Sequence, residues 1–174
     1  CCDMLSSWEA KVCPAGGKPG AGAEYSCGVG GAGGGICCGG GSEWALSADI
    51  ILAAEHATFA LPEINSGTIA DAATLKLPKR IPWHIAMELL FTGRWMDAAE
   101  AHRWGLVNEV ISPEQLLERA HELAATLAEG PPLVFAAIKE VSRAAENMRF
   151  QDALDAINGR QFPTIDTLYS SEDQ

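Results

Sequence analysis

Apolar residues recur at helical spacing through the second half of the chain. The segment PWHIAMELLFTG follows this spacing and stops at Gly93, a residue that commonly ends a helix. The next segment, DAAEAHRWG, opens with Asp97, has Glu100 three residues later and ends at Gly105. This arrangement is typical of a short helix with a capping box. We therefore predict two helices here, followed by a strand at LVNEVI.

The strongest helix signal lies in SPEQLLERAHELAATLAEG. Ser112 is expected as the N-cap, Pro113 as the first helical residue, Gln115 as the second half of a capping box and Gly130 as the terminator. Two more amphipathic helices are expected at PLVFAAIKEVSRAAENM and FQDALDAINGRQF. The C-terminal third of the chain therefore reads as a helical region.

Strand signals lie earlier in the chain. A short buried strand is predicted from Ile50 to Ala53 and a second extended piece from Thr58 to Leu61. Residues 14 to 41 hold 13 of the 18 glycines and are interpreted as turns and loops. The GVGGAG stretch matches a dinucleotide-binding pattern, but the sequence around it predicts neither the preceding strand nor the following helix. Strands followed by helices indicate an α/β core and a helical C-terminal region.

Composition narrows the class of partner. The net charge of −11 disfavours nucleic-acid binding, and no apolar run approaches the roughly 18 residues that cross a membrane. The start of the chain does not resemble a signal peptide, so a cytoplasmic location is expected. All six cysteines precede residue 39 without metal-ligand spacing, which favours reduced thiols and no metal site.

Candidate chemistry lies in GICCGGGSEWALSAD. If a helix begins at Ser42 or Glu43, the free N–H groups of Gly40 and Gly41 lie at its N-terminus and can stabilise an oxyanion. Glu63 follows in the apolar stretch FALPEI, a setting in which glutamate is usually paired or functional. Two carboxylates in one pocket are suited to adding or removing water. The alternative is that Glu43 caps its own helix and Glu63 binds a nearby backbone N–H.

Four motifs occur in order: GGGSE, ATFALPE, LLFTG and AHRWGLVNEV. Together they resemble the crotonase superfamily of enoyl-CoA hydratases and isomerases, and residues 35 to about 173 fit the pattern. SADIILAAEHATFALPE and TGRWMDAAEAHRWGLVNEV are most similar to the carnitinyl-CoA dehydratase branch. The resemblance implies an α/β crotonase (ClpP-like ββα) core that is incomplete at its N-terminal side, followed by a C-terminal helical region.

The resemblance also implies roles. Gly40 would donate its N–H to the thioester oxygen, Glu43 would orient or deprotonate water, and Glu63 would exchange the α-proton. A coenzyme A thioester would be the substrate, with no metal or redox cofactor. The chain would form a homotrimer or homohexamer through its C-terminal helices. The acyl pocket would include Trp44, Pro62 and Asp71.

The match is incomplete in two places. No segment fits the family's second oxyanion donor, and the strand expected just before Gly35 is missing from the sequence. We therefore expect the chain to be part of a longer protein, with a loop segment over 1–34, the core over 35–111 and a truncated helical region over 112–174. The alternatives are an enoyl-CoA isomerase and a catalytically silent interaction protein with the crotonase fold.

Overall fold

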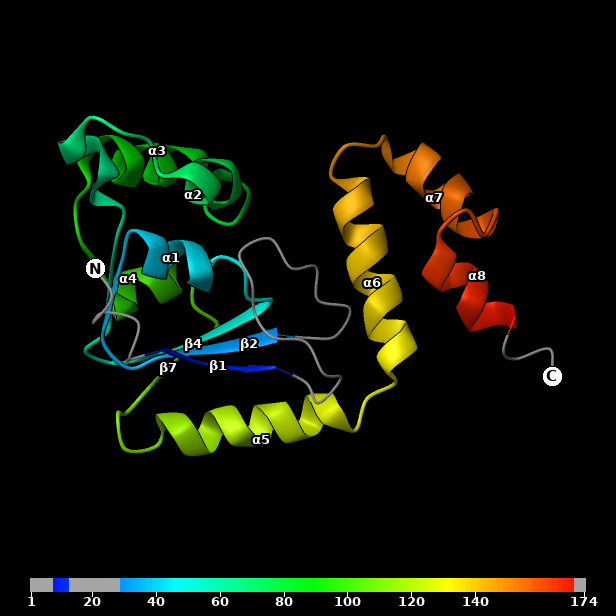
Figure 1. Ribbon diagram of the computed structural model, residues 1–174, viewed down its shortest axis with the longest axis horizontal. Helices are drawn as coiled ribbons and strands as arrows, with labels where there is room; N and C mark the ends of the chain where they lie inside the picture. The colour runs from blue at the N-terminus through cyan, green and yellow to red at the C-terminus, as the bar shows by residue number, and fades with distance from the viewer. Residues whose placement is uncertain (1–7, 13–28, 171–174) are drawn as a thin grey trace. The chain divides into compact units, whose positions relative to one another are not determined.

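A computed structural model of the chain (Figure 1) describes residues 8–12 and 29–170. Its larger sheet has the strand order β1-β2-β4-β7, formed by Trp8–Val12, Val29–Gly33, Ile50–Ala54 and Glu109–Ile111. Strands β2, β4 and β7 run parallel. A smaller sheet has the order β3-β5-β6, formed by Ile36–Cys38, Thr58–Ala60 and Met96–Asp97. In it β3 is parallel and β6 antiparallel to β5.

The strands predicted around residues 50, 58 and 109 are confirmed, whereas the loop predicted for the glycine-rich stretch is wrong where the structure describes it. Strand β2 is mostly glycine and pairs with β4 in the register Gly30↔Ile50 to Gly33↔Ala53. Strand β3 pairs with β5. β2 and β3 are held in their sheets by backbone pairing with β4 and β5. Their own side chains do not alternate between apolar and polar, so the sequence pattern does not predict these strands.

Five helices and two 3₁₀ turns of the described chain join and cover these strands. They are α1 (Gly40–Ala45), η2 (Pro62–Ser66), α2 (Asp71–Lys76), η3 (Leu77–Lys79), α3 (Trp83–Thr92), α4 (Ala98–Arg103) and α5 (Leu116–Ala128). As predicted, α3 ends at Gly93, which has a φ of 62°. At α4 the Asp97 carboxylate accepts a hydrogen bond from the N–H of Glu100 at 2.7 Å. The Glu100 carboxylate binds Arg94, so the capping box operates in one direction.

Two helices begin at other residues than predicted. Helix α1 begins at Gly40 rather than at Ser42 or Glu43. Helix α5 begins at Leu116 and follows a turn in which the N–H groups of Gln115 and Leu116 both donate to the Ser112 carbonyl. Pro113 therefore lies in a turn that precedes the helix.

The larger sheet is covered on both faces (Figure 1). Helices α1 and α4 lie over one face, and α5 runs along the other. The α5 side of the core is a buried apolar cluster with Ala120 and Leu123 packed against it; its members are Leu52, Ala54, Ile111 and Leu116. This packing holds the strands of the larger sheet in place, whereas β3 and β5 belong to the smaller sheet.

The chain forms two compact units, one containing Val29–Ala124 and the other continuing from Ala125. The second unit holds α6 (Pro132–Ala145), α7 (Phe150–Asn158) and α8 (Pro163–Ser170). Helices α6 and α7 were predicted, and α8 was not. The unit has its own apolar cluster of Ala137, Ala156, Phe162 and Ile165. The Glu140 carboxylate on α6 accepts hydrogen bonds from the N–H and hydroxyl of Thr164, which holds the first turn of α8.

Leu52 offers a test of the first unit's core. Leu52 is 3% exposed and Leu75 is 72% exposed. We expect Leu52→Ala to lower the free energy of unfolding by about 2–5 kcal/mol because it leaves a cavity. The control, Leu75→Ala, should change it by less than about 0.5 kcal/mol. Denaturant unfolding followed by circular dichroism measures both, and equal effects would contradict the described core.

Candidate active site

A single residue, Gly39, connects strand β3 to helix α1. Its φ of 53° and ψ of −122° form a backbone conformation that is dominated by glycine. The Gly39 N–H donates to the Ala60 carbonyl at 3.0 Å, and the Gly39 carbonyl accepts from the N–H of Glu43 at 3.1 Å. The turn is therefore attached to β5 on one side and to the first turn of α1 on the other.

Gly40 is the first residue of α1 and is exposed. The first N–H groups of a helix have no partner within the helix. A Cβ built on Gly40 or Gly41 would meet nothing within 4 Å, so the space beside this backbone is open. The N–H of Gly40 therefore has no partner within α1, and its role as an oxyanion donor stays a prediction.

Glu43 lies one turn further along α1. Its Oε1 accepts a hydrogen bond from the N–H of Ala73, in α2, at 3.2 Å. A second link between these segments runs from the Lys76 ammonium to the Ser47 hydroxyl at 2.8 Å. The N-cap of α1 is Gly39, which has no side chain, and the hydrogen bond described for the Glu43 carboxylate goes to α2 rather than to its own helix. Helix α2 therefore orients the Glu43 carboxylate.

Glu63 lies in the 3₁₀ turn η2 just after strand β5. Its Oε1 is close to the Gly39 turn, because a Cβ built on Gly39 would lie 2.8 Å from it. Its Oε2 is buried and has no hydrogen-bond partner among the described residues. A buried carboxylate oxygen without a partner is unfavourable for folding alone and is a common feature of functional sites. The alternative in which this carboxylate binds a nearby backbone N–H therefore leaves Oε2 unexplained.

Two thiols lie beside these groups. Burial raises the pKa of Cys37 to about 12, partly offset by a hydrogen bond with Ser42. Burial and, second, the negative charge of Glu63 raise the pKa of Cys38. Thiolate is the reactive form of cysteine, so neither residue is poised as a nucleophile at neutral pH. Both are free cysteines.

The predicted acyl-pocket residues lie on the same elements. Trp44 follows Glu43 on α1 and is 43% exposed. Pro62 is the first residue of η2 and precedes Glu63. Asp71 is the exposed first residue of α2, two positions before the residue that binds Glu43. The three residues therefore lie on α1, η2 and α2, the elements that carry Glu43, Glu63 and Ala73.

Sequence reasoning missed Gly39 and Ala73. Gly39 was hidden in a run of three glycines, where the need for a positive φ at one position leaves no signal. Ala73 acts through its backbone N–H, which every residue except proline carries. Neither contribution has a side-chain signature.

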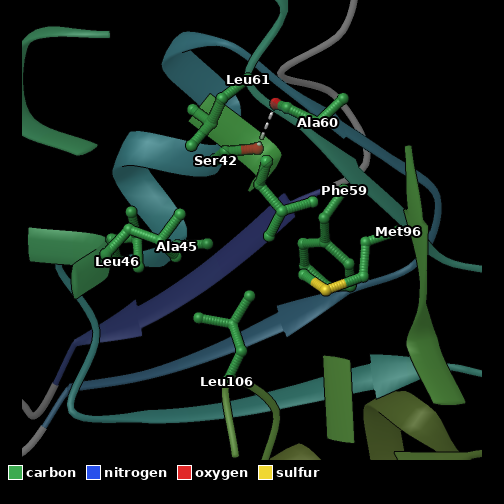
Figure 2. Close-up of a pocket in the computed structure, with 10 residues that line it drawn as sticks. Ser42, Ala45, Leu46, Phe59, Ala60, Leu61, Met96 and Leu106 are labelled. Atoms are coloured by element: carbon green, nitrogen blue, oxygen red, sulfur yellow. Dashed lines mark hydrogen bonds between the residues drawn. The ribbon is translucent and has the colours of Figure 1, made fainter. Parts of the chain in front are cut away.

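A small apolar cavity of about 20 Å³ lies beneath α1 (Figure 2). Ser42 is its one polar side chain, and Figure 2 shows the Ser42 hydroxyl directed at the Ala60 carbonyl. That hydroxyl is shared between the carbonyls of Cys37 and Ala60, at 2.8 and 2.9 Å. A void of this size holds one water at most. It is a gap in the core that supports α1, not an acyl pocket.

Residues 8–12 and 29–170 contain neither a cluster of side chains suited to bind a metal ion nor a membrane-spanning helix. In that part of the chain no group of three or more His, Cys, Asp or Glu residues is arranged to hold a metal ion. None of the helices formed there is long and apolar enough to cross a membrane.

Comparison with known proteins places these features in a family. Residues 31–168 match the family described as enoyl-CoA hydratase/isomerase. The carnitinyl-CoA dehydratases of Salmonella arizonae and Citrobacter koseri are 43% and 44% identical over 140 residues, which cover 80% of this chain and 54% of each relative. The chain thus spans about half the length of these curated relatives.

Solved structures of enoyl-CoA hydratases are similar to this chain in sequence and in fold. A crystal structure of enoyl-CoA hydratase subunit I from Geobacillus kaustophilus HTA426 is 40% identical, with a TM-score of 0.72 over 82% of this chain and 54% of that chain. An enoyl-CoA hydratase from Mycobacterium tuberculosis is 37% identical, with a TM-score of 0.67 over 70% of this chain and 48% of that chain. The chain belongs to the enoyl-CoA hydratase/isomerase family and has the crotonase fold.

The thiols provide a test of the described electrostatics. At pH 8 we expect iodoacetamide to modify Cys38 slowly and Cys37 hardly at all, with tandem mass spectrometry resolving the two sites. Glu63→Gln removes the charge that raises the pKa of Cys38, so alkylation of Cys38 should accelerate. The control Glu129→Gln should leave the rate unchanged. If Glu63→Gln left the alkylation rate of Cys38 unchanged, the Glu63 carboxylate would not lie beside this thiol.

Proposed function

We propose that this protein is an acyl-CoA hydratase or dehydratase that adds water reversibly to a 2-enoyl-CoA thioester. The observation that carries the proposal is the Glu63 carboxylate, which lies against the Gly39–Gly40 turn with a buried oxygen that no described residue binds. The same turn leads into α1, which carries Glu43. A helix-start N–H and two carboxylates make up the donor, the base and the acid that this reaction needs.

In the proposed hydration, the Gly40 N–H donates to the thioester oxygen. Glu43 takes a proton from water, and the water oxygen bonds to the β-carbon. Glu63, in its protonated form, gives its proton to the α-carbon on the same face and is left as a carboxylate, so the addition is syn. Between turnovers Glu43 releases its proton and Glu63 takes one up, which restores both starting states. Negative charge that builds on the thioester oxygen is stabilised by about 3–4 kcal/mol for each oriented donor. Dehydration runs the same steps in reverse.

The coenzyme A thioester is the substrate in this proposal, and no metal or redox cofactor takes part. The thioester withdraws charge from the α-carbon, and the protein contributes hydrogen-bond donors and proton carriers. The family pattern includes a second N–H donor from an earlier segment, and we assign it to no described residue.

Trp44, Pro62 and Asp71 are proposed to line the acyl pocket. The half-exposed indole of Trp44 adjoins Glu43 in the sequence, and an aromatic face attracts a quaternary ammonium group. This chemistry fits a carnitinyl-type acyl group, the substrate named for relatives at 43–44% identity. Free thiols at Cys37 and Cys38 support a reducing, cytoplasmic location.

The two glutamates allow a direct test. We expect Glu43→Gln and Glu63→Gln each to lower kcat by about 10²–10⁴-fold with little change in KM, because each removes a proton carrier. Hydration of crotonyl-CoA and crotonobetainyl-CoA, followed by loss of the enoyl thioester absorbance, measures this. Glu55→Gln, an exposed carboxylate after β4, is the control and should match the unaltered protein.

The alternatives give different results. An isomerase needs one proton carrier, so isomerase activity that survives Glu43→Gln would contradict a hydratase. A silent interaction protein would show no binding of a coenzyme A thioester at millimolar concentration in isothermal titration. Binding without turnover of either acyl group would also argue against the proposal.

We further propose that the chain forms a homotrimer or homohexamer. The C-terminal unit exposes large apolar side chains, including Phe150 at 82% and Ile138 at 56%, which is typical of a surface that is covered in an assembly. Sedimentation equilibrium should give a mass three or six times that of the chain, and Phe150→Asp should lower it. Leu75→Asp, in the first unit, is the control. A monomer at all concentrations would contradict this assembly.

A further inference from the structure

We propose that Gly39 is a positioning residue for Glu63: the missing Cβ leaves the space in which the Glu63 carboxylate lies against the β3–α1 turn. The effect of Gly39 on catalysis rests on the proposed function of Glu63. The effect of Gly39 on the position of the carboxylate is argued from the geometry around Gly39 alone.

The space is narrow. A Cβ on Gly39 would lie 2.8 Å from Oε1 and 3.8 Å from Cδ of Glu63. Non-bonded carbon and oxygen atoms pack no closer than about 3.0 Å, so a side chain at this position must displace the carboxylate or the turn. The structure indicates which of the two can move.

The turn is the more constrained partner. The Gly39 N–H and carbonyl are both hydrogen-bonded, to Ala60 and Glu43. Just before the turn, Cys38 is paired with Ala60 in the β3–β5 register. The hydroxyl of Ser42, which is buried, also reaches the Ala60 carbonyl. The contact between a Cβ at position 39 and the carboxylate would therefore be relieved by rotation of the Glu63 side chain, while the positive φ would remain strained for any residue other than glycine.

The Glu63 backbone is also held. Its carbonyl accepts hydrogen bonds from the N–H and the hydroxyl of Thr68, at 3.2 and 3.3 Å. Pro62 restricts the backbone just before it. Movement is thus confined to the side-chain torsions, and these set where the proton carrier lies.

Other glycines provide the comparison. Gly67 and Gly105 share a positive φ, at 72° and 80°, but a Cβ on either would meet nothing within 4 Å. A Cβ on Gly93 would meet Pro62, Ile64 and Asn65 rather than Glu63. Among the eight glycines from Gly39 onward, Gly39 is the one with the Glu63 carboxylate among the nearest neighbours of a built Cβ.

Cys38 reports the position of that carboxylate without any turnover. The Glu63 charge raises the pKa of the Cys38 thiol, so moving the carboxylate away lowers it. We would measure Cys38 alkylation by iodoacetamide against pH in Gly39→Ala, Glu63→Gln and Gly105→Ala proteins. In Gly39→Ala the Cys38 rate at pH 8 should rise by about two- to fivefold, toward that of Glu63→Gln. Gly105 also has a positive φ, but a Cβ there would not meet the Glu63 carboxylate. Gly105→Ala should therefore leave the pH profile of Cys38 alkylation unchanged.

An unaltered Cys38 profile in a folded Gly39→Ala protein would overturn the inference. If Gly39→Ala does not fold, thermal unfolding of Gly39→Ala/Glu63→Ala decides. Removing the carboxylate should raise Tm by more in the Gly39→Ala background than in Gly105→Ala, because only the first also relieves the contact at position 39. An equal gain in both backgrounds would overturn the inference.

Turnover gives a separate readout. If the proposed activity is present, Gly39→Ala should lower kcat about as much as Glu63→Gln does and should leave KM unchanged. An unaltered kcat would overturn the positioning role. If no activity is found, the function proposal fails while the Cys38 measurement still decides the geometry.

Discussion

The hydrogen bond from the Gly39 N–H to the Ala60 carbonyl is the contact on which the site depends. It ties the end of β3 to the end of β5, so the two segments that follow, α1 and η2, leave the small sheet side by side. One segment brings the Gly40 N–H and the other brings Glu63. The buried Ser42 hydroxyl adds a second bond to the same carbonyl and keeps the first turn of α1 against the sheet. The start of α1 and the Glu63 carboxylate therefore lie close together because Gly39 and Ser42 both donate to the Ala60 carbonyl at the end of β5.

The electrostatics of this corner are set by burial more than by ion pairing. Glu63 has a buried oxygen that no described residue binds, and the neighbouring Cys38 thiol has a raised pKa. Glu43 is only partly buried and has one oxygen bonded to a backbone N–H. The two carboxyl groups therefore differ in their hydrogen bonding: one oxygen of Glu43 has a backbone partner, and Oε2 of Glu63 has none among the described residues.

The sequence predicted the parts of this fold that depend on side-chain patterns. The buried strand at Ile50, the glycine stop at Gly93 and the amphipathic helices of the C-terminal unit all have a periodic apolar face or a capping residue. Strand β2 could not be predicted, because glycine in a strand carries no pattern and its place is decided by the partner strand. Helix α8 is short, and Thr164 at its first turn is held by Glu140, 24 residues away.

The same distinction applies to the site and has a consequence for how it can be mapped. Glu43 and Glu63 could be identified in advance because their side chains carry the proposed chemistry, whereas Ala73 contributes only an amide proton. A scan that replaces each side chain with alanine would leave position 73 unaltered and would record it as inert. The contribution of α2 would emerge only from a change to the main chain itself, such as an ester in place of the Ala73 amide or a proline at that position. Part of the support for Glu43 is therefore invisible to alanine scanning.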